Sequence, residues 1–432
     1  MSDLDALAQA LRTAGSVGLR MDERTVRARC EGHRLPAVAD ALAALGAQVQ
    51  VMAATDTRAT AGDFTLAYVF APPSGRPQAH VLVSIPAADP RFPSLATRSF
   101  PASRFEREIH DLFGLVPDGH PDLRRLALHQ FWPDGYHPLR RDTVVRRDFQ
   151  DGGEPFPFRQ VEGEGIFEIT VGPVHAGVIE PGHFRLSVEG ETIVNLEIRL
   201  GWVHRGIEKL FETLPLERTP ALAERVSGDE SVAHALAYCQ ALEALSGTTI
   251  PRRAAWLRVL LLELERLYNH VGDVGMIVND TGFGFGHAHC FRLREELLRL
   301  NERLTGHRLL RGAVVPGGVT GPVVEADLEA TAARVIRLAA EFSEVAALCL
   351  ANTLVLERLQ GTGHLSPATA RALQVVGLSG RASGLDADVR RDAPFAAYAQ
   401  VPVPVPVYTA GDVWARTMVR IDEVAVAARL VA

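Results

Sequence analysis

The N-terminal third of the chain alternates between two hydrophobic periods. Apolar residues recur every three or four positions over 4–14 and 35–45, which predicts two helices. Three short runs rich in β-branched and aromatic residues, at 47–53, 64–70 and 80–85, predict strands. Gly, Pro and Asp separate these runs. The pattern predicts an α+β domain with a small mixed sheet over residues 1–145.

A polar stretch rich in Gly and Pro, residues 146–165, predicts a linker. The remaining residues, 166–432, predict a second domain that is predominantly α-helical, with a short antiparallel sheet at its N-terminal end. The expected strands are 167–171, 184–188 and 193–198, and the expected helices are 207–212, 230–245, 252–278, 288–305, 325–356, 367–375 and 411 to the C-terminus.

Composition restricts the class of protein. With 47% hydrophobic and 22% charged residues and a net charge of −7, the chain is typical of a folded globular protein and offers no positive field for a nucleic acid. The four cysteines include no C-x-x-C pair, so we expect no cysteine-held zinc or iron–sulfur site. The acidic N-terminus does not read as a signal peptide, and no apolar run reaches the ~20 residues of a membrane span.

Charged residues gather in the segment Phe105-Glu-Arg-Glu-Ile-His-Asp-Leu-Phe-Gly-Leu115, which is followed by Gly119-His-Pro-Asp-Leu-Arg-Arg125 and Pro138-Leu-Arg-Arg-Asp142. From the residues alone, this is a short helix with carboxylates and a basic loop anchored by ion pairs. The string closely resembles the signature of the subunit-C-type proteins of complex I, with Arg141 in place of a Lys. The resemblance implies a docking domain rather than an active site.

A second polar group lies in Gly201-Trp-Val-His-Arg-Gly-Ile-Glu-Lys209. Helical spacing places His204, Arg205 and Glu208 near one face. A buried Glu beside His and Arg can transfer protons near neutral pH, whereas an exposed group of this kind is an ordinary ion pair. Upstream, a Gly-Pro turn in Gly172-Pro-Val-His-Ala-Gly177 presents His175, although a lone His is more often structural.

Both of these segments resemble the subunit-D-type proteins of complex I and the large subunit of the group 4 membrane-bound nickel–iron hydrogenases, of the formate hydrogenlyase and hydrogenase-4 type. Residues 172–185 match the hydrogenase pattern G-P-V-H-A-G-x-x-E-P-G-H-F-R, and residues 204–209 match H-R-G-x-E-K. Further matches follow in order at 257–270, 292–306, 316–319, 381–384 with 388–392, and 411–416.

The chain departs from the hydrogenases at their metal ligands. Where they show E-R-x-C-G-x-C, this sequence reads Glu224-Arg-Val-Ser-Gly-Asp-Glu230, so Ser227 and Glu230 stand at the two cysteine positions. The second cysteine pair of that family lies beyond the G-D-V-x-A-R helix, and the given sequence stops at Ala432. Nickel and iron in such sites need soft thiolates, so we expect no nickel–iron centre and no metal held by this chain.

In complex I the equivalent space binds a quinone headgroup through a His and a Tyr. Here His175 matches the first His of the loop, but the second has no clean match, and the nearest Tyr is Tyr238. Quinone is therefore one candidate ligand of a cavity that collects carboxylates and His suited to coupled protonation. The predicted proton-transfer residues are Glu208, His204, Arg205 and His234, and the predicted acceptor-cavity residues are His175, Asp229 and Glu230.

The resemblance implies a subunit of an energy-converting oxidoreductase of the NADH-quinone oxidoreductase or hydrogenase type. It would lie in the cytoplasm, peripheral to the inner face of the cell membrane. Its expected partners are a subunit-B-like iron–sulfur small subunit, which would hold a 4Fe-4S cluster, and antiporter-like and subunit-H-like membrane proteins. Two alternatives stay open: a non-catalytic scaffold of such a complex, and a hydrogenase large subunit in which the cysteine losses are compensated.

Overall fold

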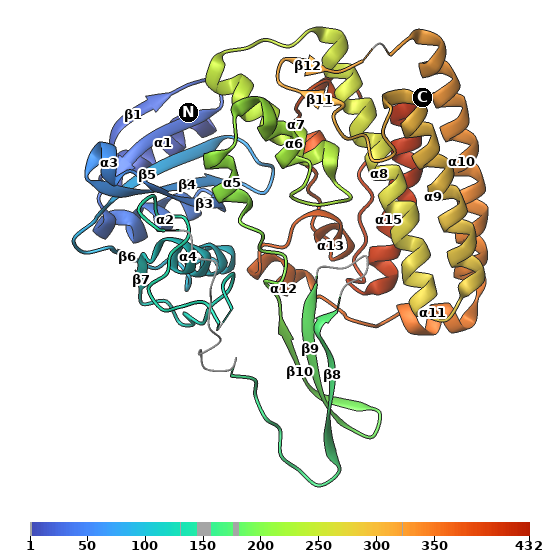
Figure 1. The fold of residues 1–432 in the computed structure, drawn as a ribbon, viewed down its shortest axis with the longest axis horizontal. Helices are drawn as coiled ribbons and strands as arrows, with labels where there is room; N and C mark the ends of the chain where they lie inside the picture. The colour runs from blue at the N-terminus through green and yellow to red at the C-terminus, as the bar shows by residue number, and fades with distance from the viewer. Residues whose placement is uncertain (1, 130, 145–156, 176–180, 322) are drawn as a thin grey trace. The chain divides into compact units, whose positions relative to one another are not determined.

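The computed structural model describes residues 2–129, 131–144, 157–175, 181–321 and 323–432 (Figure 1). The chain divides into two compact units, Met1–Lys209 and Leu210–Ala432. The α+β architecture predicted from the sequence is confirmed: a mixed sheet lies in the N-terminal part, and helices dominate the C-terminal part. The division falls after Lys209 rather than within 146–165, and most of that predicted linker lies outside the described residues.

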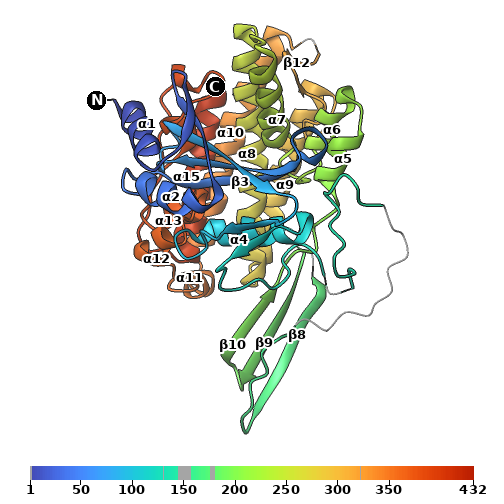
Figure 2. The ribbon, with the colours of Figure 1, turned by 90° about the vertical axis from the view of Figure 1, so that its left-hand side faces the viewer.

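The first unit contains a five-stranded mixed sheet in the order β1-β2-β5-β4-β3. Its neighbours are antiparallel except for β2 and β5, which are parallel. Two helices, α1 (Asp3–Thr13) and α2 (Leu35–Ala43), pack together on the sheet (Figure 2). The strands are β1 (Val17–Met21), β2 (Thr25–Cys30), β3 (Gln48–Asp56), β4 (Asp63–Ala71) and β5 (Gln78–Pro86).

Helix α4 (Phe100–Phe113) carries the charged signature of the first unit and organises the loop that follows. The buried Asp111 carboxylate accepts the backbone N–H groups of residues 126, 127 and 128 at 2.8, 2.9 and 3.1 Å. Buried Arg107 donates to the carbonyls of residues 124 and 125. Burial raises the pKa of Glu106 to about 7, although Ser94 and the Leu95 amide hydrogen-bond to it. These charges therefore shape the loop from inside, and are not the surface ion pairs that the sequence suggested.

A three-stranded antiparallel sheet, β8 (Ile166–His175), β9 (Gly182–Glu189) and β10 (Thr192–Arg199), follows in the order β10-β9-β8. It groups with the first unit because its last strand is bonded to the signature loop. Buried Arg199 donates to the carbonyls of residues 125, 126 and 128, and the His129 ring hydrogen-bonds to the Gly201 carbonyl at 3.3 Å.

The second unit is built on long helices that run side by side (Figure 1). Apolar faces of α8 (Arg252–Asp280), α9 (Gly284–Thr305), α10 (Glu325–Ala351) and α15 (Val413–Val431) form its main core. Shorter elements complete the list: α5 (Ile207–Thr213), whose residues span the division between the units, then α6 (Thr219–Ala223), α7 (Ser231–Ser246), the β11–β12 hairpin (Val314–Val315, Gly318–Val319), α11 (Thr353–Leu359), α12 (Pro367–Ala372), α13 (Gly377–Ala382) and α14 (Val389–Asp392).

The single helix expected over 325–356 is wrong in one respect, because the chain breaks at Asn352. The Asn352 side chain accepts the N–H groups of Leu354 and Val355 and so starts a new helix, α11. In the described part of the chain, no single helix combines the length and apolarity that a membrane span needs. The bent pair Ala326–Ala351 and Thr353–Leu359, with 83° between its arms, meets these criteria together.

Candidate functional site

The segment that precedes α7, residues 224–230, is held on several sides by the second unit. Tyr268 and Asn269 of α8 donate to the Asp229 carbonyl at 2.6 and 3.0 Å. Arg311 donates to the Gly228 carbonyl at 3.3 Å. These bonds fix the segment that stands where the hydrogenase pattern has its first cysteine pair, and they pre-order any site built on it.

Glu265 of α8 caps the start of α7 from outside that helix. Its carboxyl oxygens accept the N–H groups of Val232 and Ala233 at 2.6 and 2.9 Å. Glu230 occupies the N-cap position of α7, but its own side chain makes no capping bond. Burial raises the pKa of Glu265 to about 8, even though the two amides favour its charged form. A group with this pKa exchanges its proton near neutral pH.

A second buried carboxyl, Glu224, lies at an apolar cavity of about 730 Å³. Glu224 accepts the backbone N–H of Gly312, and burial raises its pKa. The other residues that line this cavity are Leu216, Glu217, Pro220, Ala221, Leu242, Leu245, Ser246, Gly312, Val314, Val315 and Pro316. The cavity therefore offers a mostly hydrophobic surface with a titratable carboxyl, the composition expected of a site for a small apolar ligand.

Several predicted site residues gather at the start of α7. The His234 ring lies 3.8 Å from the Glu230 carboxylate, one turn away on the same helix. The Asp229 carboxylate lies 4.0 Å from the Arg294 guanidinium. Ser227 is half-buried, while Asp229 and Glu230 are exposed. Tyr238 donates to the Thr219 hydroxyl at 2.6 Å and contacts the Phe211 ring.

The other predicted residues belong to the first unit. Glu208 is exposed in the first turn of α5, Arg205 is exposed, and His204 is half-buried. Burial first, and then the negative charge of Glu208, raises the pKa of Glu108 in α4, so the two carboxyls influence each other. His175 pairs with Gly182 at the end of β8, and its side chain lies outside the described residues. A shared cavity of Glu208 with Asp229, Glu230 and His234 remains a prediction, because these residues belong to different units.

The sequence motifs include a further buried cluster, to which no role was assigned from the sequence. Three arginines and three carboxylates from α8 and the C-terminal helices form one ion network with a histidine and a tyrosine. Arg381 donates to Glu423 at 2.6 Å, and Arg390 donates to Glu423 at 3.1 Å and to Asp388 at 2.7 Å. The ion network comprises Glu263, Arg266, His270, Arg381, Asp388, Arg390, Tyr398 and Glu423.

The ion network does not titrate near neutral pH. Burial opposes ionisation of Glu423, yet the His270 hydrogen bond and the neighbouring arginines hold its pKa well below the usual range. The pKa of Asp388 is also lowered, since Arg390 outweighs its burial. Burial lowers the pKa of His270, which as a neutral ring donates through Nε2 to Glu423 at 2.7 Å. Three positive and three negative charges balance, so the ion network anchors helices rather than moving protons.

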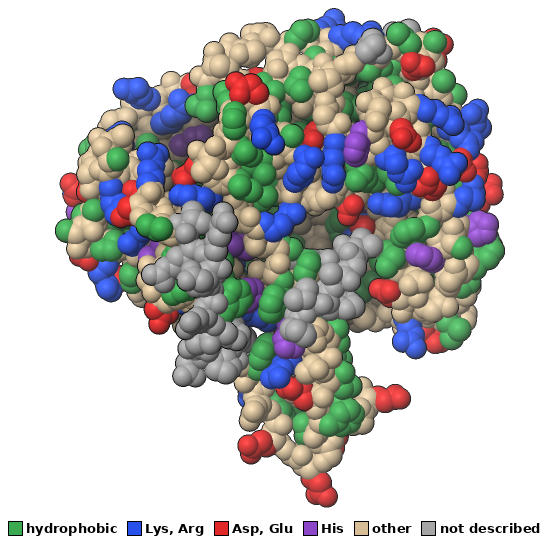
Figure 3. Space-filling view, in the orientation of Figure 1, with side chains coloured by type: hydrophobic (Ala, Val, Ile, Leu, Met, Phe, Trp, Pro, Cys, Tyr) green, Lys and Arg blue, Asp and Glu red, His purple; other side chains and the backbone are tan. Residues whose placement is uncertain are grey.

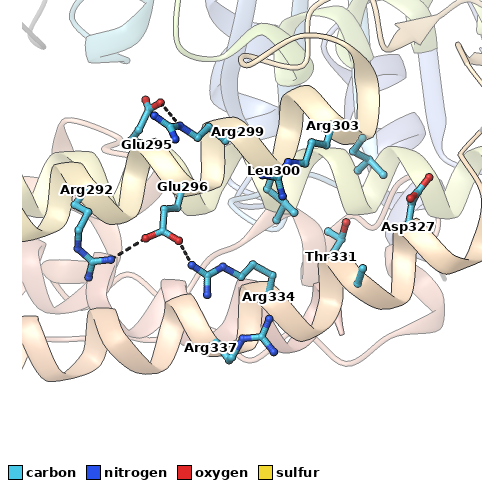
Figure 4. A pocket seen from close by; sticks show the side chains of 12 residues that line it. Arg292, Glu295, Glu296, Arg299, Leu300, Arg303, Asp327, Thr331, Arg334 and Arg337 are labelled. Atoms are coloured by element: carbon cyan, nitrogen blue, oxygen red, sulfur yellow. Dashed lines mark hydrogen bonds and ion pairs between the residues drawn. The ribbon is translucent and has the colours of Figure 1, made fainter.

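A charged groove between α9 and α10, with a volume of about 770 Å³, is a second cavity of this unit (Figure 4). Its carboxylates are already paired. Glu296 lies between Arg292 and Arg334, and Glu295 accepts from Arg299 at 2.8 Å. Such largely solvent-exposed pairs contribute little to stability or chemistry. This groove is therefore surface, and the α7 segment is the stronger candidate site.

The residues at the degenerate ligand positions do not fit a nickel–iron centre. A serine hydroxyl at 227 and an exposed carboxylate at 230 are hard donors, whereas this metal pair needs thiolates. The cysteine nearest in sequence, Cys239, is buried in the core, and burial raises its pKa to about 11. In the described ranges, no group of three or more His, Cys, Asp or Glu side chains is placed to hold a metal ion.

Comparison with known families agrees with this architecture. Residues 28–148 match the family "Respiratory-chain NADH dehydrogenase, 30 Kd subunit", and residues 280–432 match "Respiratory-chain NADH dehydrogenase, 49 Kd subunit". The order of the two matches defines a class of oxidoreductase-family subunits in which the two complex I domains are fused. The chain belongs to this family of C/D fusion proteins of complex I, which includes relatives of hydrogenase large-subunit type.

Individual relatives sharpen the placement. Formate hydrogenlyase subunit 5 of Escherichia coli K12 is 36% identical over 392 residues, which cover 89% of this chain and 69% of that protein. Hydrogenase-4 component G of the same organism is 36% identical, over 86% of this chain and 65% of its own length. The C/D fusion protein of NADH-quinone oxidoreductase from Phocaeicola vulgatus is 33% identical, over 78% and 68%. The chain thus spans about two thirds of the length of these relatives.

A solved structure is also similar. It is described as the membrane-bound sulfane sulfur reductase, an archaeal respiratory membrane complex. The matched chain is 28% identical with a TM-score of 0.58, over 62% of this chain and 72% of that one. The likeness therefore extends to a third kind of membrane-bound redox complex.

Proposed function

We propose that the chain is the hydrogenase-like subunit of a membrane-associated, energy-converting oxidoreductase complex. In this role it supplies an acceptor-side pocket and a proton-exchange site, without a nickel–iron centre of its own. Its relatives carry the names of a formate hydrogenlyase, a hydrogenase-4 and a NADH-quinone oxidoreductase, which supports membership of such a complex. The electron-carrying cluster would belong to an iron–sulfur partner, and antiporter-like and subunit-H-like membrane proteins would complete the assembly on the cytoplasmic side.

The observation that carries this proposal is the raised pKa of two buried carboxyls beside the α7 segment, Glu224 and Glu265. A proton donor works best when its pKa is near the working pH. Reduction of a quinone-class acceptor takes up one proton for each electron. Glu224 is suited to deliver such a proton because it is buried at the apolar cavity, and Glu265 and the His234–Glu230 pair are suited to exchange protons behind it.

The first-unit residues form a second proton-transfer group in this proposal. Glu208 and Glu108 interact electrostatically, and His204 and Arg205 adjoin Glu208 in sequence. Two carboxyls that share negative charge keep one proton to a higher pH than either would alone. His175 would lie on the acceptor loop.

Glu224→Gln in the assembled complex tests the proposal. Gln keeps the size and the acceptor for the Gly312 N–H but cannot release a proton, so quinone-dependent turnover should fall at least about tenfold. The unfolding midpoint should stay unchanged. The matched control is Glu295→Gln on α9, an exposed and already paired carboxylate, which should stay within about twofold of wild type.

One specific observation favours the alternative, a non-catalytic scaffold. The charge-balanced ion network ties α8 to the C-terminal helices without a titratable member near neutral pH. A scaffold needs only this body. Unchanged turnover in Glu224→Gln would support the scaffold and exclude the proton-delivery role.

A further inference from the structure

The sheet formed by β8, β9 and β10 has one face that is apolar in all three strands. Residues directly opposite each other in an antiparallel pair point to the same side. Ile169, Leu186 and Leu196 form one such row, and the rows on either side of it are apolar in every strand as well. On the outer strands Phe167, Ile193 and Ile198 remain 51–54% exposed. We call this surface the apolar sheet face.

A bulge keeps the apolar sheet face continuous. The register of β10 shifts between Ile193 and Asn195, so that Ile193 and Leu196 face the same side although they are three residues apart. Without the shift, strict alternation would turn Ile193 to the opposite side. The local backbone irregularity thus adds one more hydrophobic residue to this surface.

The opposite face of the same sheet is polar and is covered by the chain itself. The ring of Phe158, which precedes β8, lies 4.4 Å from the Arg185 guanidinium carbon and 5.1 Å from the His183 ring. The Arg159 N–H donates to Glu197 at 2.8 Å. In the described residues the chain therefore provides a cover for the polar face, while the outer strands of the apolar face stay exposed.

The size of the apolar sheet face indicates the kind of contact it makes. Three strands ~4.8 Å apart and rows that span five residues at ~3.4 Å each give about 240 Å². A stable dimer buries about 800 Å² on each partner, so this face alone is too small to hold two copies together. Exposed apolar patches of a few hundred Å² mark contacts with other proteins or membranes.

Charge at the free end of the sheet separates these occupants. Glu162 and Glu164 lie just before β8, and Glu189 and Glu191 lie at the turn between β9 and β10, at the same end because Ile166 pairs with Glu189. All four are exposed, and Figure 3 shows carboxylates around hydrophobic side chains on this sheet. Four carboxylates are repelled by an anionic lipid surface and attract Lys and Arg.

We propose that the apolar sheet face docks an apolar segment of a partner protein, which places Lys or Arg residues against the four glutamates at the tip of the sheet. The contact adds a small, directional element to a larger subunit interface. It depends on membership of an assembly and not on the proton chemistry at Glu224.

Site-specific photo-crosslinking in the assembled complex tests this docking. With Leu196→p-benzoylphenylalanine, irradiation should join the chain to one partner subunit, at a segment with Lys or Arg within about ten residues. The matched control is Glu197→p-benzoylphenylalanine, which points to the opposite face and should crosslink within the chain, near residue 159. Crosslinks from position 196 to lipid, to a second copy of this chain, or no more to a partner than from position 197 would overturn the proposal.

A charge test on the same complex separates protein from lipid. Ile169→Lys should reduce the chain retained in the purified complex at least fivefold, whereas Thr170→Lys on the other face should leave it within twofold. Glu162→Lys combined with Glu189→Lys should also reduce retention. Unchanged or increased retention with the tip variant would overturn the proposal. Glu224→Gln should leave the crosslink intact, so failure of docking and failure of the proposed function are distinguishable.

Discussion

At the scale of single residues, the partner of each buried carboxyl decides its protonation. Glu423 and Asp388 face arginines, and their pKa values are lowered despite burial. Glu224 and Glu265 are hydrogen-bonded by backbone amides in apolar surroundings, and burial raises their pKa values. Two amides stabilise a carboxylate less than a full positive charge does, so desolvation prevails. The buried acids thus divide into permanent ions and exchangeable protons.

Glu265 predicts a distinct dependence of stability on pH. Its folded-state pKa of about 8 exceeds the ~4.3 of an unfolded Glu, so between these values the folded chain binds more protons. The free energy of unfolding should therefore fall as pH rises from 5 to 8, by at most about 1.4 kcal/mol per pH unit from this group. Glu265→Gln should remove this slope.

The measurement is urea unfolding of the full chain at pH 5, 6, 7 and 8, with wild type and Glu265→Gln compared at each pH. Glu106, whose pKa is raised to about 7, contributes a slope of the same sign to both proteins and cancels in the difference. Parallel pH profiles for the two proteins would mean that Glu265 is ionised throughout this range.

At the scale of elements, the ion network connects α8 with α13, α14 and α15. Glu423 of α15 accepts from Arg381 and Arg390 and from His270. Glu423→Gln would leave buried positive charge without its counter-ion, which costs about 3–5 kcal/mol. The thermal midpoint should fall by about 10 °C, given 2–4 °C per kcal/mol for a unit of this size.

Calorimetry of Glu423→Gln and of a control, Glu341→Gln, checks this. Glu341 pairs with Arg292 at 2.9 Å, but both side chains are more than 40% exposed, so its removal should cost less than about 1 kcal/mol. If the two variants had equal midpoints, the ion network would not anchor these helices.

Most elements could be predicted from periodicity, and the exceptions have identifiable causes. The strands β1 and β2 were not predicted: β1 is largely exposed, and β2 alternates small apolar residues with arginine, so neither forms a continuous apolar run. The break at Asn352 was missed because the apolar period continues across it, whereas the capping bonds appear only in three dimensions.

The candidate site was harder to predict than the elements. Motif order led to Asp229, Glu230 and His234, which do lie together at the start of α7. Periodicity cannot say which turn of α8 meets α7, so Glu265 could not be recognised as the external cap. Glu263, Arg266 and His270 share a helix face in sequence, but their partners follow more than a hundred residues later.

At the scale of the whole molecule, the motif order defines a hydrogenase-like body joined to a subunit-C-like domain. The boundary between the units could not be read from the linker, because Arg199 bonds the three-stranded sheet to a loop some seventy residues earlier. The hard side chains at 227 and 230 do not suit nickel–iron chemistry, so the polar groups around α7 and the apolar cavity carry the proposed activity.

Redox-induced infrared difference spectroscopy of the assembled complex tests that activity most directly. At pH 7 we expect the carbonyl stretch of a protonated carboxyl that changes when the acceptor is reduced and is absent from Glu224→Gln. Glu295→Gln should leave this signal in place. A spectrum that is the same in wild type and Glu224→Gln would contradict the claim that Glu224 exchanges a proton with the acceptor.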